Sequence, residues 1–199
     1  MKKGLLVIMT GVMLFASLTI VNAESQSDTI TNRSGVVIPI EKYNALKSIY
    51  SNNFMEFMTQ DQYDIIKDKD LSKVEIVETT DEDLNTSGIR PQTTEYTTTS
   101  KSLRIINNNG YITMSLTWLK VPSIKKYDVM AFRLNSSVTR TTGYSFRQYY
   151  MSNGDLKATT STYPLDFDNG SGVTFKVQNG TDHEMEMTFN VTGTGRVYG

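Results

Sequence analysis

The chain has 199 residues, of which 38% are hydrophobic and 21% charged, and its formal net charge is −1 at pH 7. A chain of this size can form one substantial core, or a core with a small appendage, and its near-neutral charge argues against a nucleic-acid partner. The sequence contains no cysteine, which excludes disulfides, thiol nucleophiles, thiolate metal sites and a lipid-modified cysteine.

Residues 1–23 have the layout of a secretory signal peptide. Lys2 and Lys3 precede a mostly apolar stretch that ends in Val21-Asn22-Ala23. We expect cleavage after Ala23, which leaves 199 − 23 = 176 residues, and a secreted or cell-surface protein of bacterial origin. The alternative is a membrane-anchored protein with an uncleaved signal, because a bilayer is spanned by about 20 predominantly apolar residues.

Residues 24–38 are polar and are predicted to form a flexible mature N-terminus. Residues 39–72 are predicted to form two or three short helices, beginning at Pro39. Thr59 and Gln62 have the spacing of a capping box, which predicts a helix from Gln60 to Lys69. Helices this short need tertiary packing for stability.

Residues 73–92 are predicted to form an acidic strand and linker. The charge also changes sign near this segment. Residues 24–95 carry 7 basic and 14 acidic side chains (7 − 14 = −7), whereas residues 96–199 carry 11 and 7 (11 − 7 = +4). The shift in composition at the same place indicates two structural regions.

Residues 93–199 alternate apolar and polar side chains with a period of two. The clearest series runs through Ile112, Met114, Leu116 and Trp118, and a second runs from Met185 to Val191. Asn-Gly dipeptides begin at residues 109, 153, 169 and 179 and are typical of tight hairpin turns. The sequence therefore predicts a mainly β protein: an antiparallel β-sandwich, or a partial barrel, preceded by two or three short α-helices.

Three features resemble catalytic or metal-binding sites. His183 is the single histidine and follows a predicted turn, so we expect an exposed hairpin residue rather than a catalytic base. The segment 166–170 (DFDNG) lacks the spacing of a calcium loop and is predicted to be a turn. Glu184 and Glu186 share one strand face, which we expect to be solvated, although paired carboxylates also serve glycoside hydrolases.

Basic and aromatic side chains gather in the predicted strands after Trp118. The candidate ligand-binding residues are Lys125, Lys126, Arg147 and Tyr149. If Arg147 and Tyr149 share a face, they can form a surface for an anionic polymer or a sugar. The alternative is that the aromatic side chains belong to the core and the basic ones solvate a sheet edge.

Three segments resemble parts of a group of uncharacterised exported proteins of Gram-positive bacteria. They are residues 58–64 (MTQ…YD), 118–129 (WLKVP…YDV) and 193–199 (GTGRVYG). The group has no assigned activity, so the resemblance supplies no catalytic or binding residues. It implies a shortened C-terminus, because in that group further strand sequence follows the last glycine.

The function predicted from these observations is a non-enzymatic binding module of unknown activity. It has no cofactor and no metal, and its partner is a cell-wall polymer or another protein. Contact with the membrane is then limited to the signal peptide. Two alternatives stay open: a secreted glycoside hydrolase-like enzyme that uses paired carboxylates, and a truncated product without independent function.

Overall fold

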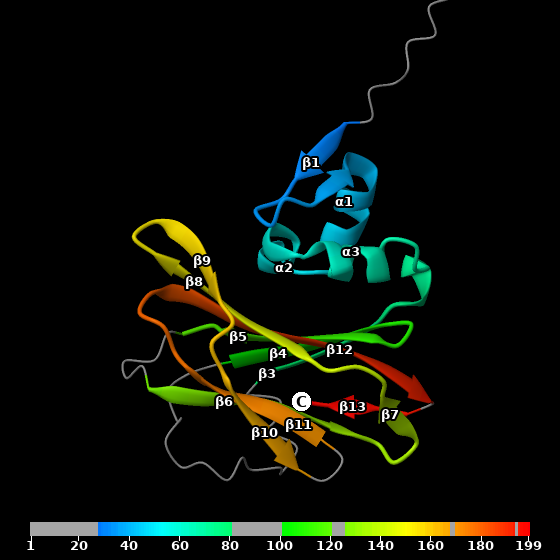
Figure 1. The fold of residues 1–199 in the computed structure, drawn as a ribbon, viewed down its shortest axis with the longest axis vertical. Helices are drawn as coiled ribbons and strands as arrows, with labels where there is room; N and C mark the ends of the chain where they lie inside the picture. The colour runs from blue at the N-terminus through cyan, green and yellow to red at the C-terminus, as the bar shows by residue number, and fades with distance from the viewer. Residues whose placement is uncertain (1–27, 81–100, 121–125, 168–169, 194) are drawn as a thin grey trace, which may run out of the picture.

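The structure is a computed structural model that describes residues 28–80, 101–120, 126–167, 170–193 and 195–199. It has three layers: a helical layer, a large antiparallel sheet and a small antiparallel sheet (Figure 1). The predicted class is confirmed, since the chain is mainly β and a few short helices precede the sheets of a sandwich.

Residues 28–73 form the first layer, which we call the cap. It consists of a two-stranded hairpin and three short helices, followed by a single 3₁₀ turn: β1 (Thr29–Thr31), β2 (Val37–Pro39), α1 (Ile40–Lys47), α2 (Asn52–Phe57), α3 (Gln60–Ile66) and η1 (Leu71–Lys73). None of the helices in the described part of the chain is long and apolar enough to cross a membrane.

Side-chain caps explain where two of the helices begin. The Ser51 side chain accepts a hydrogen bond from the amide of Phe54 at the start of α2. The predicted capping box of α3 is confirmed: Thr59 Oγ1 accepts from the amide of Gln62 at 3.3 Å, and Gln62 Oε1 accepts from the amide of Thr59 at 2.9 Å.

The hairpin β1–β2 replaces the flexible terminus that we expected up to residue 38. Ile30 and Ile38 are paired across it, and Ile38 is buried. The buried side chain of Asn32 donates to the carbonyl oxygens of Met55 (3.0 Å) and Met58 (2.8 Å) at the end of α2. These bonds explain why a polar segment is ordered, because they satisfy backbone acceptors inside the cap.

The large sheet is antiparallel, in the order β3-β4-β5-β12-β8-β9, with β7 paired to the end of β12. Its strands are β3 (Glu75–Thr80), β4 (Lys101–Asn108), β5 (Tyr111–Trp118), β7 (Val138–Arg140), β8 (Ser145–Ser152), β9 (Asp155–Thr159) and β12 (Thr181–Gly193). Since β3 pairs with β4, the sheet begins within residues 73–92, before the predicted boundary at residue 93.

Two of the four Asn-Gly dipeptides close hairpins of the large sheet. Asn109 and Gly110 join β4 to β5 and have φ of 49° and 83°, and Asn153 and Gly154 join β8 to β9 with φ of 54° and 82°. Positive φ at both positions gives the twist that two-residue hairpins require. Asn179 and Gly180 precede β12 without positive φ, and Asn169 lies outside the described residues.

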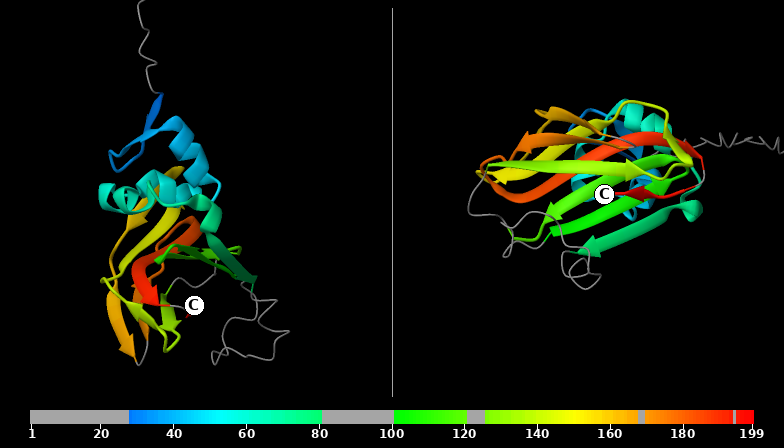
Figure 2. Two further views of the ribbon diagram at one scale, coloured as in Figure 1. Left: turned by 90° about the vertical axis from the view of Figure 1, so that its right-hand side faces the viewer. Right: turned by 90° about the horizontal axis from the view of Figure 1, so that it is seen from below.

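The small sheet lies on the other side of the large sheet from the cap, and Figure 2 (right) views it from below, in front of the large sheet. Its strand order is β10-β11-β6-β13, again antiparallel. The strands are β6 (Tyr127–Leu134), β10 (Tyr163–Phe167), β11 (Gly170–Lys176) and β13 (Val197–Tyr198).

Two apolar clusters hold the layers together. The sandwich cluster fills the space between the sheets and includes the stacked rings of Phe132 and Phe189, whose centroids are 3.9 Å apart. The second cluster has twelve buried residues, of which ten come from the cap and only Ile106 and Tyr111 from the large sheet. The cap therefore has its own small core, and its junction with the sheet depends on other contacts.

Candidate functional site

Polar side chains fill most of the junction between the cap and the large sheet. Alternation along the strands turns them toward the cap, while Met114, Met185 and Met187 point into the sandwich. We call this set the polar layer: Thr113, Ser115, Arg147, Tyr149, Glu184, Glu186 and Thr188. The strand register brings its members together, because Glu186 pairs with Ser115 on β5 and with Arg147 on β8.

We expected the face that carries Glu184 and Glu186 to be solvated, but both residues are buried. The residues are 6% and 2% exposed, because the cap covers this side of the sheet (Figure 1). Asn53 of α2 donates to Glu184 Oε2 at 2.7 Å, and Gln62 of α3 donates to Thr188 Oγ1 at 3.4 Å. An alternating strand pattern is the same whether its polar side faces water or a polar partner.

Burial dominates the electrostatics of the two carboxyl groups. It raises the pKa of Glu184, although hydrogen bonds from Ser51, Asn53 and Ser115 oppose the shift. It raises the pKa of Glu186 further, since the neighbouring Glu184 adds to the effect and Arg147 only partly offsets it. The neutral carboxylic acid of Glu186 is thus favoured in the folded protein.

The carboxyl pair does not line an open cleft. Glu184 and Glu186 are alternate residues of one strand, about 7 Å apart along it, and Asn53 of α2 contacts Glu184. Asp128, an acidic residue of β6, forms an ion pair with Lys101 at 3.0 Å. A glycosidase needs two carboxyl groups on either side of an accessible bond, and these residues do not provide that arrangement.

The four predicted binding residues do not form one exposed surface. Arg147 and Tyr149 share a face, but Tyr149 is fully buried, and Arg147 is half-buried and donates to the carbonyl oxygen of Phe57. The Tyr149 ring packs against Phe57 of the cap, with ring centroids 5.6 Å apart. Lys126 is exposed beside β6 of the small sheet, and Lys125 lies outside the described residues.

His183 is buried rather than exposed. A register shift between Thr181 and Glu184, with Asp182 at φ 51°, turns the ring inward at the start of β12. Its Nε2 lies 3.2 Å from the carbonyl oxygen of Gly180, which can only accept, so Nε2 carries the proton. The ring is therefore part of the structure of this turn.

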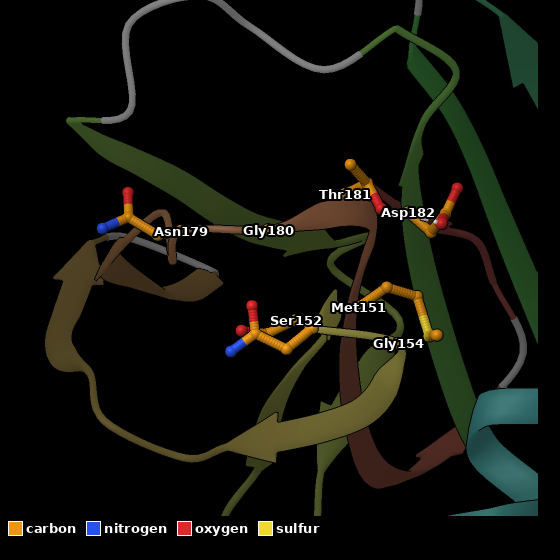
Figure 3. A pocket seen from close by; sticks show the side chains of 8 residues that line it. Met151, Ser152, Gly154, Asn179, Gly180, Thr181 and Asp182 are labelled. Carbon is orange, nitrogen blue, oxygen red and sulfur yellow. Dashed lines mark hydrogen bonds between the residues drawn. The ribbon is translucent and has the colours of Figure 1, made fainter.

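A shallow hollow of about 450 Å³ lies between two turns of the large sheet. Its lining comes from the β8–β9 turn and from the segment that leads into β12 (Figure 3). Asp182 is the one ionisable side chain in this lining, so the hollow lacks an acid–base pair.

An exposed aromatic surface lies on the side of the small sheet that faces away from the sandwich. We call it the tyrosine face, and its members are Tyr127, Val129, Arg133, Tyr163, Lys176 and Tyr198. Register places them on one side, because Val129 and Tyr163 both pair with Thr174, Tyr127 pairs with Lys176, and Arg133 pairs with Tyr198. Tyr127, Tyr163 and Tyr198 are 55%, 62% and 51% exposed.

No family model, curated protein or solved structure matches the chain. The similarity of its three segments to exported proteins of Gram-positive bacteria accordingly stays a prediction. Any proposal about function depends on the surfaces described above.

The sequence pattern contained a signal for the tyrosine face that the prediction did not use. Met130 and Phe132 alternate with Val129 and Ala131, so core positions for the first two turn the other two outward on the same strand. A group of apolar and aromatic side chains on one exposed strand face is informative, although single exposed ones are common. Tyr127 and Val129 were missed because only the inward residues of this strand were considered.

Metal ligands do not gather among the described residues: no group of three or more His, Cys, Asp or Glu side chains there could hold a metal ion. The segment compared with a calcium loop is divided, since Asp166 belongs to β10 whereas Asp168 and Asn169 lie outside the described residues.

Proposed function

We propose that the protein is exported and acts outside the cell as a non-enzymatic binding module for a cell-wall polymer. The observation that carries this proposal is the tyrosine face, where three tyrosines and Val129 are each about half exposed or more. Apolar and aromatic side chains grouped on an exposed sheet face are typical of a binding surface. The export signal at residues 1–23 supports an extracellular place of action.

The arrangement of the carboxyl groups supports a binding role over a hydrolytic one. Glu184 is engaged by Asn53, and Glu186 lies under the cap, so a polysaccharide chain has no direct access to them. The tyrosine face, in contrast, belongs to a sheet whose strands are fixed by the sandwich cluster on their other side. A surface supported in this way suits a polymer ligand, because little of the protein has to be ordered when the polymer binds.

Retention on purified cell walls tests the proposal. We expect residues 24–199 to co-sediment with walls in a salt-sensitive manner, and the double variant Tyr127→Ala/Tyr163→Ala to lose about tenfold in retention. Val77→Ala, which removes an exposed side chain from β3 of the other sheet, is the control and should bind like the wild type.

Two results would count against this function. Absence of wall retention would refute the binding module, and loss of retention after protease treatment of the walls would identify a protein partner instead. Because the substituted side chains are exposed, circular dichroism of each variant should match the wild type.

A further inference from the structure

The chemistry of the tyrosine face points to a particular class of polymer, if the face is the binding surface proposed above. Two of its three tyrosines meet at one corner, where the ring centroids of Tyr127 and Tyr163 are 6.3 Å apart and inclined at 55°. Tyr198 lies toward the other end of the face, paired with Arg133. Two inclined rings at an exposed corner form a shallow angle into which the apolar side of a sugar ring can pack.

The charged part of the face is basic. Lys176 pairs with Tyr127 at the aromatic corner, exposed Lys126 precedes the same strand, and Arg133 lies toward the far end of β6. Among the described side chains of the four strands, Asp128 is the one acid, and it is 11% exposed and paired with Lys101 toward the sandwich. The face therefore complements a negatively charged ligand.

Gly172 and Ala131 lie in the middle of the face and pair with each other. Gly172 is buried, and a Cβ atom at position 172 would come within 2.7 Å of the Ala131 Cβ atom, so larger side chains are excluded there. The face extends along β6 from Tyr127 to Arg133, roughly 20 Å at the usual rise per strand residue.

We propose that this face binds a phosphodiester-containing glycan, with sugar rings on Tyr127 and Tyr163 and phosphate groups against Lys176 and Arg133. Lysine binds phosphate as a point charge, and arginine binds it through a planar fork of donors. The two side chains lie toward opposite ends of the face, so each can contact a different phosphate group of one chain. The ligand class rests on the proposed function, because it uses the same face.

Defined polymers separate this inference from the general binding role. Residues 24–199 are titrated by calorimetry with a glycosylated polyol-phosphate polymer, a polyuronate and a neutral glucan of matched length, at 50 and 200 mM salt. We expect the phosphate polymer to bind at least tenfold more tightly than the neutral glucan, and its affinity to fall at the higher salt.

Variants at Tyr163 and Lys176 measure the contributions of the aromatic contact and of the charge separately. Tyr163→Ala should lower affinity for the phosphate polymer about tenfold, whereas Tyr163→Phe, which keeps the ring, should retain it. Lys176→Gln should lower affinity about threefold at 50 mM salt and have a smaller effect at 200 mM. The matched control is Lys157→Gln, an exposed lysine on β9 of the other sheet, which should leave affinity unchanged.

Three outcomes would overturn the inference. If the neutral glucan binds as tightly as the phosphate polymer, charge has no role in recognition. If the polyuronate binds more tightly, the preferred anionic group is a carboxylate and not a phosphate. If none of the polymers binds, the ligand is not a glycan. Walls freed of phosphate polymers by mild acid distinguish the two proposals. If they still retain the protein, the binding module stands and the phosphodiester ligand is wrong.

Discussion

Glu186 is a carboxyl group that the fold places between Arg147 and Glu184, beneath the cap. Its pKa is raised because burial and the second carboxyl group favour the neutral form, with Arg147 opposing. A raised folded-state pKa means that the native protein binds more protons than the unfolded chain above the ordinary pKa of glutamate. Stability is then greatest below that pKa and is lost as the pH rises toward the folded-state value.

Glu186→Gln should remove this loss of stability at high pH. We expect the variant to be more stable than the wild type at pH 8, by on the order of 1–3 kcal/mol, the size of the penalty for burying an unpaired polar group. Near pH 4 the two proteins should differ little, because the wild-type carboxyl group is then neutral and similar in shape. Urea unfolding across this pH range measures both effects.

The control for this prediction is Glu41→Gln on the exposed side of α1, which should change stability by no more than about 0.5 kcal/mol at any pH. If Glu186→Gln were destabilising at pH 8, the electrostatic attraction of Arg147 would outweigh the desolvation of Glu186. The proposed cause of the pKa shift would then be wrong.

The environment of each residue in this site depends on contacts with distant parts of the chain, which limited what the sequence could predict. Arg147 and Tyr149 were predicted to share a face, and they do, but whether that face meets water depends on residues 28–73, more than 70 positions earlier. Asn53 and Glu184, for example, are 131 residues apart in the chain. Local periodicity carries no signal for such a contact.

At the scale of elements, the hairpin β8–β9 offers a clean test of backbone conformation. Gly154 has φ of 82° and open space around its Cα atom, whereas Gly143 has equal space and no positive φ. Gly154→Ala should destabilise the protein by about 1–2 kcal/mol, because an L side chain disfavours the left-handed region. Gly143→Ala should be neutral or slightly stabilising, since alanine reduces the entropy of the unfolded chain.

Thermal unfolding of the two variants decides this prediction. Equal melting temperatures would mean that the turn relaxes to another conformation at no cost. The register of β8 against β9 would then not depend on the Asn153-Gly154 turn.

Elements with a strong local signal were predicted well. The capping box at Thr59 and Gln62 located the start of α3, and the alternation from Ile112 to Trp118 located β5. The hairpin β1–β2 was missed because strands of three residues are too short to show a period. Its order comes from Asn32, whose hydrogen bonds to the end of α2 are not visible in the sequence.

For the whole molecule, the two apolar clusters predict two units of different stability. The cap supplies ten of the twelve buried residues in its own cluster and meets the sheet mainly through the polar layer. Polar contacts add less net stability than apolar burial. We therefore expect the cap to open in fluctuations that leave the sandwich folded.

Native-state hydrogen exchange at pH 7 measures this difference. The amides of α3 should exchange at least about tenfold faster, after correction for intrinsic rates, than the central amides of β5 and β12. Equal protection in α3 and β5 would show that cap and sandwich open together, and that the polar layer couples them more tightly than we infer.

The polar layer also affects whether molecules with an opened cap would aggregate. With the cap lifted, β5, β8 and β12 would present to water threonine, serine, glutamate and arginine beside the rings of Tyr111 and Tyr149. The side chains that stay inside the sandwich are Met114, Phe146, Met185, Met187 and Phe189. Exposed apolar sheet faces promote aggregation, and this one would be largely hydrophilic. The molecule can thus expose a whole sheet face for a time and remain in solution.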